Sequence, residues 1–179
     1  MKPRLGTRLR YAVALAATVT IAAGGQVDEY RVKAAFLYNF AKFVEWPAQS
    51  FNGAGDPLTI CVLGENPFGR GLVEIVRGQV AGGRRLAVRQ VADVRQAGGC
   101  HILFVSSSER SRSRSILETL NPAGVLTVGE SEGFAAEGGV MNLKLEGGRI
   151  RIEVNLEAAN RGHLRISSKL LSLALIVKQ

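Results

Sequence analysis

Few residues in this sequence have the types and spacing that enzymatic chemistry requires. The two histidines, His101 and His163, are not spaced as a metal pair, and neither has an evident partner that would make it a general base. No phosphate-binding P-loop is present. Because His101 begins an apolar run and His163 lies in a polar segment, both are expected to be structural. The sequence therefore favours a binding function without cofactor over catalysis.

Three polar loops are the best candidates for a ligand site: residues 65–67, 106–108 and 129–131. Each follows a predicted strand and is expected to lead into a helix start. Ligands of open α/β sheets bind beyond the carboxyl ends of strands, where helix starts offer free N–H groups to an anion. The alternative is that Asn66, Ser108 and Ser131 only cap helices. The candidate ligand residues are Asn66, Ser106, Ser107, Ser108, Arg110 and Ser131.

Residues 1–23 have the pattern of a cleavable signal peptide. Four basic residues precede an apolar run over residues 11–23, and small residues follow it. The alternative is a membrane anchor, but a spanning helix needs about 20 apolar residues. We therefore expect export to the periplasm, with no membrane-spanning segment after cleavage.

Removal of this segment changes the charge of the chain. The whole sequence has 23 Lys+Arg and 15 Asp+Glu, a net charge of +8. The residues after 23 keep 19 basic and 15 acidic side chains, a net charge of +4. Nucleic-acid-binding domains carry clustered basic faces, so this mild excess argues against a nucleic-acid partner.

Cys61 and Cys100 are the two cysteines of the chain. An even number in an oxidising compartment favours a disulfide. The bond would close a loop of about 39 residues and contribute about 4 kcal/mol in the chain-entropy model. The alternative is a pair of buried free thiols, because Cys61 lies inside an apolar run.

Strands and helices alternate through the first two thirds of the exported chain, which predicts a layered α/β sheet. Continuous apolar runs at 58–63, 101–105 and 125–128 are typical of buried parallel strands, and 85–91 alternates as a further strand. Helices are predicted over 28–45, starting at Asp28, after Asn66-Pro67, and over 109–120.

The pattern changes near the C-terminus. Two period-two runs around Gly147-Gly148 predict an antiparallel hairpin with one solvated face. A last helix is predicted over 169–177. Together these elements predict a single α/β domain over residues 28–179, with a layered sheet of mixed strands, helices on both faces and an antiparallel hairpin near the C-terminus.

Two surfaces are candidates for a protein partner. The helix over 28–45 carries an aromatic stripe that is best explained as core packing. Its second face, with Lys33, Leu37 and Tyr38, is a possible partner surface, and the solvated face of the hairpin is another. A homodimer is also possible.

Several segments resemble the YfiR family of periplasmic proteins. They are Val32-Lys-Ala-Ala-Phe-Leu-Tyr-Asn-Phe-Ala-Lys-Phe-Val-Glu-Trp-Pro47, residues 60–69, residues 100–109, residues 125–129, Gly133-Phe134 with the hairpin, and Ile166-Ser-Ser-Lys-Leu-Leu171. These segments occur in the family's order and span nearly the whole exported chain.

The resemblance implies a non-enzymatic periplasmic regulator. Known members repress an inner-membrane diguanylate cyclase through its periplasmic portion, which lowers cyclic-di-GMP and biofilm formation. Cys61 and Cys100 match one cysteine pair of the family, whereas the second pair of some members, near the hairpin, is missing here. An alternative is a small-molecule-binding sensory module that serves another membrane signalling protein.

Overall fold

A computed structural model describes residues 23–120 and 124–178, with side chains described from residue 29 onward. The predicted signal peptide over 1–23 lies outside this part of the chain, apart from its last residue. No helix in the described ranges combines the length and apolar character needed to cross a bilayer.

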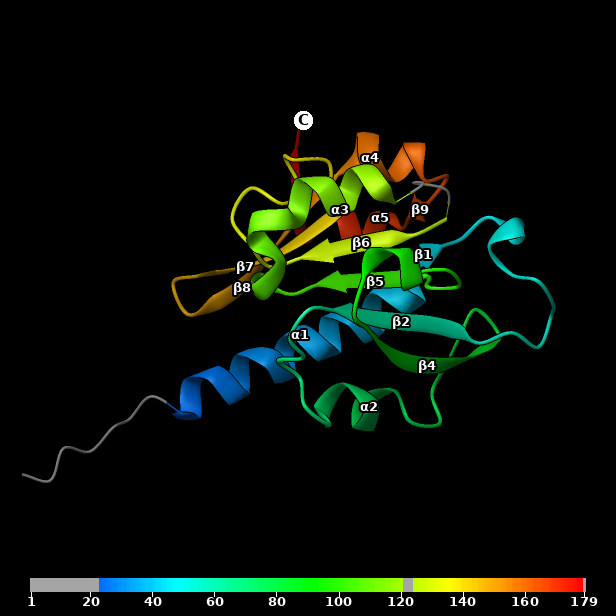
Figure 1. Ribbon diagram of the computed structural model, residues 1–179, viewed down its shortest axis with the longest axis horizontal. Helices are drawn as coiled ribbons and strands as arrows, with labels where there is room; N and C mark the ends of the chain where they lie inside the picture. The colour runs from blue at the N-terminus through cyan, green and yellow to red at the C-terminus, as the bar shows by residue number, and fades with distance from the viewer. Residues whose placement is uncertain (1–22, 121–123, 179) are drawn as a thin grey trace, which may run out of the picture.

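The fold is built on one mixed sheet of eight strands, in the order β10-β8-β7-β6-β5-β2-β4-β3 (Figure 1). The strands are β2 (Leu58–Leu63), β3 (Val80–Ala81), β4 (Arg84–Val91), β5 (Ile102–Val105), β6 (Leu126–Gly129), β7 (Met141–Glu146), β8 (Arg149–Asn155) and β10 (Ala174–Val177). A separate short pair joins β1 (Val44–Glu45) to β9 (Arg165–Ile166). Strands β4, β2, β5, β6 and β7 are parallel neighbours, so the predicted α/β sheet with mixed strands is confirmed.

Both faces of the central strands are buried, which explains their continuous apolar runs. In β5, Ile102 and Phe104 face the cluster that contains α1 (Ala23–Phe43) and α2 (Gly71–Val76). Leu103 and Val105 face the opposite cluster, which includes residues of α3 (Ser113–Thr119). Helices therefore cover both faces, as predicted.

Helix α1 begins earlier than the sequence pattern suggested. The structure describes it from Ala23, so Asp28 lies inside the helix and does not start it. The helix ends at Phe43, just before Trp46-Pro47, as the proline predicted. It packs against α2 and β8 on the side of the sheet opposite α3, and Figure 1 shows it passing behind β2.

The predicted hairpin is confirmed. Strands β7 and β8 pair in register from Met141 opposite Val154 to Glu146 opposite Arg149. Gly147 and Gly148 both have positive φ, 58° and 74°, as a two-residue type I′ turn requires. Its polar face is less solvated than expected, however. Asn142 and Asn155 are fully buried because their amides donate to carbonyls of the 130–139 loop, which covers them.

The predicted helix over 169–177 is wrong in its second half. Helix α5 covers only Ser168–Leu171, and Ala174–Val177 form β10, which pairs in parallel with β8. Helix α4 (Leu156–Arg161) links β8 to β9. Strand β10 is an edge of the sheet, and Leu175 on it is 61% exposed.

Candidate functional site

The candidate ligand loops do lie together, at the carboxyl ends of β2, β5 and β6. These strands are adjacent and parallel, so their ends meet at one edge of the sheet. The hydroxyl of Ser108 accepts a hydrogen bond from the backbone N–H of Glu65 at 2.9 Å. Gly64 permits this approach, because a Cβ on it would lie 2.5 Å from the Ser108 hydroxyl.

A carboxylate of the chain itself occupies the place that was predicted for an anion. The backbone N–H of Ser107 donates to Oε1 of Glu130 at 2.8 Å. The ammonium of Lys33 donates to Oε2 of the same carboxylate at 2.6 Å and pairs with Glu29 at 2.5 Å. The side chains of Lys33 and Glu130 are only 4% and 2% exposed. We call Lys33, Glu130, Glu29 and the Ser107 N–H the buried ion cluster.

Tyr30 completes the surroundings of this cluster. The Lys33 ammonium lies 4.7 Å from the centre of the Tyr30 ring, a cation–π contact. Burial, followed by the negative charge of Glu130, raises the pKa of Tyr30 to about 12. The phenol is therefore neutral at physiological pH, and it adds no charge to the cluster.

The glycines beside Glu130 let its loop pack closely. The ring of Phe134 is 1% exposed and lies against Gly129 and Gly139, where an added Cβ would be 2.2 Å from the ring. This packing holds the loop after β6 against the sheet. The position of the Glu130 carboxylate is thereby fixed from both ends of the loop.

The other predicted ligand residues serve mainly as local caps. The side chain of Asn66 accepts from the N–H of Phe68 at 3.0 Å. Ser106, not Ser108, caps the 3-10 helix Ser107–Arg112, and the carbonyl of Ser131 accepts from Asn142. The side chain of Arg110 is exposed and has no hydrogen bond or ion pair with any residue that the structure describes.

The structure buries two of the three residues of the partner surface that was predicted on α1. Lys33 and Leu37 are 3% and 0% exposed, because α1 is covered by the sheet and by the loops at its carboxyl edge. Tyr38 is half-buried, and its hydroxyl donates to Gln79 at 3.0 Å. The exposed side of α1 instead carries Arg31 and Val32.

The sequence also contains one motif typical of a catalytic serine, which was not among the candidate sites predicted above. Residues 129–133 read Gly-Glu-Ser-Glu-Gly, the spacing of a nucleophile elbow, in which the serine sits between a strand and a helix. Here Ser131 follows β6 but leads into turns instead of a helix. The ring nitrogens of His101 are bonded elsewhere, and His163 is exposed in a turn after α4. The pattern therefore forms a covering loop, with no triad geometry among the described residues.

The disulfide between Cys61 and Cys100 is present, with Cα atoms 5.8 Å apart. It joins β2 to the loop before β5 inside the cluster on the α3 face. The guanidinium of Arg89 donates to the carbonyl of Gly98 at 2.6 Å and lies 3.2 Å from the sulfur of Cys100. The bond therefore ties neighbouring strands beneath a charged side chain from β4.

His101 is structural, as its sequence context predicted. Its Nδ1 accepts from the N–H of Thr59 at 3.1 Å, so Nε2 carries the proton and donates to the carbonyl of Ser50 at 3.0 Å. The ring stacks on Phe51 at 4.3 Å. Burial lowers the pKa of His101, which keeps the ring neutral.

Stability is expected to fall as the pH drops below about 6.5, the ordinary pKa of histidine. The folded pKa of His101 is lowered, so the unfolded chain takes up the proton first. The stabilisation is therefore complete above the unfolded pKa and is lost as the pH falls toward the folded pKa. The slope approaches about 1.4 kcal/mol per pH unit, measured by urea unfolding between about pH 5 and 8. The control variant His163→Asn replaces an exposed residue and should keep this pH dependence. If His163→Asn abolished the pH dependence, the assignment to His101 would be contradicted.

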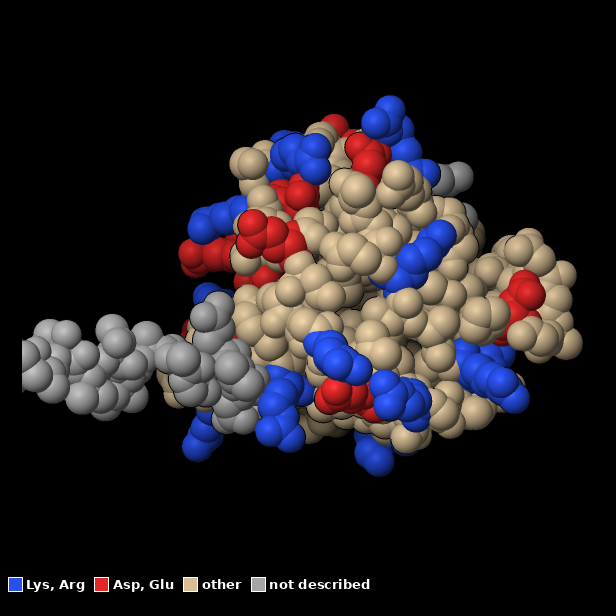
Figure 2. Space-filling model, turned by 60° about the horizontal axis from the view of Figure 1, so that its bottom comes forward, with Lys and Arg blue, Asp and Glu red and all other residues tan. Residues whose placement is uncertain are grey.

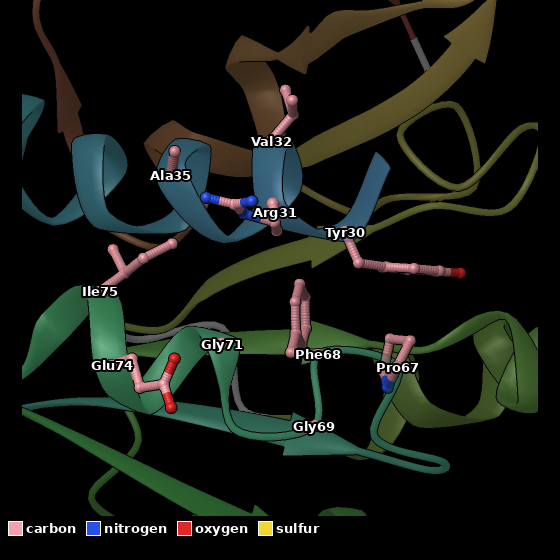
Figure 3. Close-up of a pocket in the computed structure, with 10 residues that line it drawn as sticks. All are labelled: Tyr30, Arg31, Val32, Ala35, Pro67, Phe68, Gly69, Gly71, Glu74 and Ile75. Carbon is pink, nitrogen blue, oxygen red and sulfur yellow. The ribbon is translucent and has the colours of Figure 1, made fainter. Parts of the chain in front are cut away.

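An open groove runs beside the buried ion cluster, between α1 and α2 (Figure 3). It has a volume of about 990 Å³. Val32 and Ala35 of α1 are among its lining residues, and Phe68 and Ile75 point toward α1 from the opposite side. The ring of Phe68 meets Tyr30 edge-on at 5.7 Å and Phe104 of β5 at 4.8 Å, so the floor of the groove is continuous with the core.

These features define a disulfide-bonded α/β domain whose candidate site is closed by its own side chains. A family profile described as YfiR/HmsC-like matches residues 30–175, and the chain therefore belongs to this family. The family is one of periplasmic regulators linked to cyclic-di-GMP signalling. No curated protein matches the chain.

Two solved structures match part of the chain at low similarity. One is described as an ABC domain in complex with L-Trp from Streptococcus pneumonia, with 10% identity and a TM-score of 0.49 over 67% of this chain and 55% of the other. The second is a conserved domain protein from Vibrio cholerae O1 biovar El Tor, with 14% identity and a TM-score of 0.47 over 68% and 54%. The chain thus spans just over half of each, and neither likeness is close enough to support a functional assignment.

Proposed function

We propose that this protein is a non-enzymatic periplasmic repressor of an inner-membrane diguanylate cyclase, acting through the periplasmic portion of that enzyme. Membership of the YfiR/HmsC-like family is the observation that carries the proposal. The disulfide supports it, because such bonds persist in oxidising compartments. By lowering cyclic-di-GMP, the protein would also lower biofilm formation.

The closed carboxyl edge of the sheet supports binding over catalysis. The polar groups there bond to one another: Ser107 and Lys33 to Glu130, and Glu65 to Ser108. This arrangement fixes the outer surface of the domain and offers no positioned base beside a nucleophile. Repression then follows from differential binding, in which the domain stabilises the inactive state of the cyclase.

Deletion of the gene is expected to raise cellular cyclic-di-GMP, measured by mass spectrometry of nucleotide extracts. A repressor with the usual coupling free energy shifts the ratio of the two cyclase states by about 5- to 150-fold. Re-expression of the whole chain should restore the low level. A chain without residues 1–23 should fail to do so, because it stays on the cytoplasmic side of the membrane.

The matched control separates export from folding. The truncated chain fused to a different export signal should restore repression. Unchanged cyclic-di-GMP after deletion, in cells that contain the exported protein, would contradict the proposal.

The groove between α1 and α2 favours a second candidate, a small-molecule-binding sensory module. Its volume of about 990 Å³ and its apolar floor are typical of ligand sites. A ligand found by thermal shift in a strain whose cyclic-di-GMP does not change on deletion would favour this function.

A further inference from the structure

The β10 end of the sheet carries the most exposed apolar side chains of the described residues. Seven large hydrophobic residues are exposed in this part of the chain, and three of them lie between positions 173 and 176. Leu173 and Leu175 are the most exposed of the seven, at 71% and 61%, and Ile176 is 44% exposed. Single exposed hydrophobic residues are common on protein surfaces, but a cluster of them marks an interaction site.

The same end of the sheet has an unpaired strand edge. Strand β10 pairs with β8 on one side, and no described strand pairs with its other side. The outward N–H and C=O groups of such an edge are a template for another strand, and proteins usually block them with charged residues, prolines or very short strands. The opposite end of the sheet is blocked in this way, because β3 has only two residues. The sequence of β10, Ala174–Val177, contains no charged residue and no proline.

Charged side chains are scarce beside this edge. Lys and Arg side chains are spread over the face of the molecule that Figure 2 shows. Residues 170–177, in contrast, contain no charged residue. Of the β8 residues that pair with β10, only Glu153 is charged, and it accepts a hydrogen bond from Asn142 at 3.0 Å. Because the edge offers no charge to select a charged partner, it is suited to an apolar one.

A second copy of the chain fits this edge because the edge is self-complementary. A two-fold axis perpendicular to the sheet places two β10 strands antiparallel and keeps the corresponding faces of both sheets on the same side. Residues that lie opposite each other in an antiparallel pair point to the same face, so the axis passes beside one residue and not between two. With the axis beside Leu175, this leucine lies opposite its own copy, and Ala174 lies opposite Ile176 of the second copy.

The exposed residues favour this register over its neighbour. An axis beside Leu175 also brings Leu173 next to Val177 of the second copy, so the most exposed leucine of the described chain is covered. An axis beside Ile176 would leave Leu173 outside the paired segment and would bring the charged Lys178 opposite Ala174.

We propose that two copies of this protein associate through antiparallel pairing of their β10 strands about Leu175. The contact covers Leu173, Leu175 and Ile176 in each copy. Only four residues of each chain form the strand, and small interfaces are typical of weak complexes, so the dimer should dissociate on dilution. Because the axis preserves the faces of the sheet, the grooves between α1 and α2 open on the same side of the dimer. The proposal goes beyond repression of a cyclase, since self-association needs no cyclase and is measured without one.

The test is sedimentation velocity of the exported protein, purified from periplasm, from about 1 μM to about 1 mM, the range of dissociation constants of weak complexes. The mean sedimentation coefficient should rise with concentration from that of a monomer toward that of a dimer. Leu175→Lys should stay monomeric throughout, because it places two ammonium groups opposite each other and solvates the edge.

Val80→Lys is the matched control, because it introduces the same charge at a residue that is 52% exposed on β3, at the other end of the sheet. It should dimerise as the unmodified protein does, and circular dichroism should show that both variants are folded. An unmodified protein that stays monomeric at about 1 mM would overturn the proposal and leave the edge to a strand of another protein. Equal association of the two lysine variants would also overturn it.

A cysteine cross-link tests the register. Opposite residues of an antiparallel pair have Cα atoms about 4.5–5.5 Å apart, within the range of a disulfide. Leu175→Cys should therefore form a covalent dimer on non-reducing gels, while the native cysteines stay bonded to each other. Ile176→Cys is the control on the same strand: it is displaced by two residues from its own copy and should cross-link far less. Equal cross-linking of both variants would overturn the register about Leu175.

Discussion

Replacement of Lys33 by methionine is expected to lower the free energy of unfolding by about 3–5 kcal/mol. Methionine fills a similar volume but leaves the Glu130 carboxylate, which is 2% exposed, with the Ser107 N–H and no counter-ion. Removing one partner of a buried pair is far costlier than removing both, because the remaining charge stays desolvated. Denaturant unfolding followed by circular dichroism measures the loss.

A double-mutant cycle makes this expectation specific. Lys33→Met/Glu130→Gln removes both charges and should recover most of the stability that Lys33→Met loses. Lys144→Met is the surface control, because Lys144 is 36% exposed in its pairs with Glu132 and Glu146. Its effect should stay below about 1 kcal/mol. A double variant no more stable than Lys33→Met would mean that packing, and not charge, determines the effect.

Replacement of both cysteines by alanine is expected to cost about 4 kcal/mol. The bond closes a loop with a sequence separation of 39 residues and joins buried sulfurs, so its loss releases the unfolded chain without exposing a new polar group. The measurement is urea unfolding with and without reductant. The unmodified protein should shift to the lower midpoint when it is unfolded in reductant, whereas Cys61→Ala/Cys100→Ala should not respond.

The single variant Cys61→Ala is the control for packing. In reductant it should be about as stable as the double variant, because both then lack the bond. If Cys61→Ala/Cys100→Ala were as stable as the oxidised protein, the loop would already be restrained in the unfolded state without the disulfide.

The secondary-structure elements that were predicted correctly are those whose hydrophobic pattern fits only one type of structure. The hairpin follows from period-two runs around Gly147-Gly148, and the buried strands from their continuous apolar runs. The last segment was misassigned because a short apolar run from Leu170 to Val177 fits a buried helix and an edge strand equally well. Only its pairing with β8 decides between them.

The sequence predicted the location of the candidate site but not the charged residues that occupy it. The strand order brought the three loops together as expected. The charged groups at their centre, however, are the side chains of Glu130 and of Lys33, which lies 97 residues away in the sequence. Lys33 appeared exposed because a charged side chain on a helix is usually solvated, and no local pattern shows a buried counter-ion. The only feature of the sequence that could have indicated the burial of Lys33 is its position between Tyr30 and the aromatic stripe of the helix.

The two ends of the sheet differ in a way that limits self-assembly. Strand β10 presents an apolar edge with Leu175 and Ile176 exposed, a template on which another chain's strand can add. At the opposite end, Arg85 and Arg89 of β4 are exposed charged side chains, which keep the neighbourhood of that edge solvated. Head-to-tail stacking of sheets into an open ribbon would therefore place these arginines at every junction between copies. Polymerisation by strand addition would stop after two copies joined through β10.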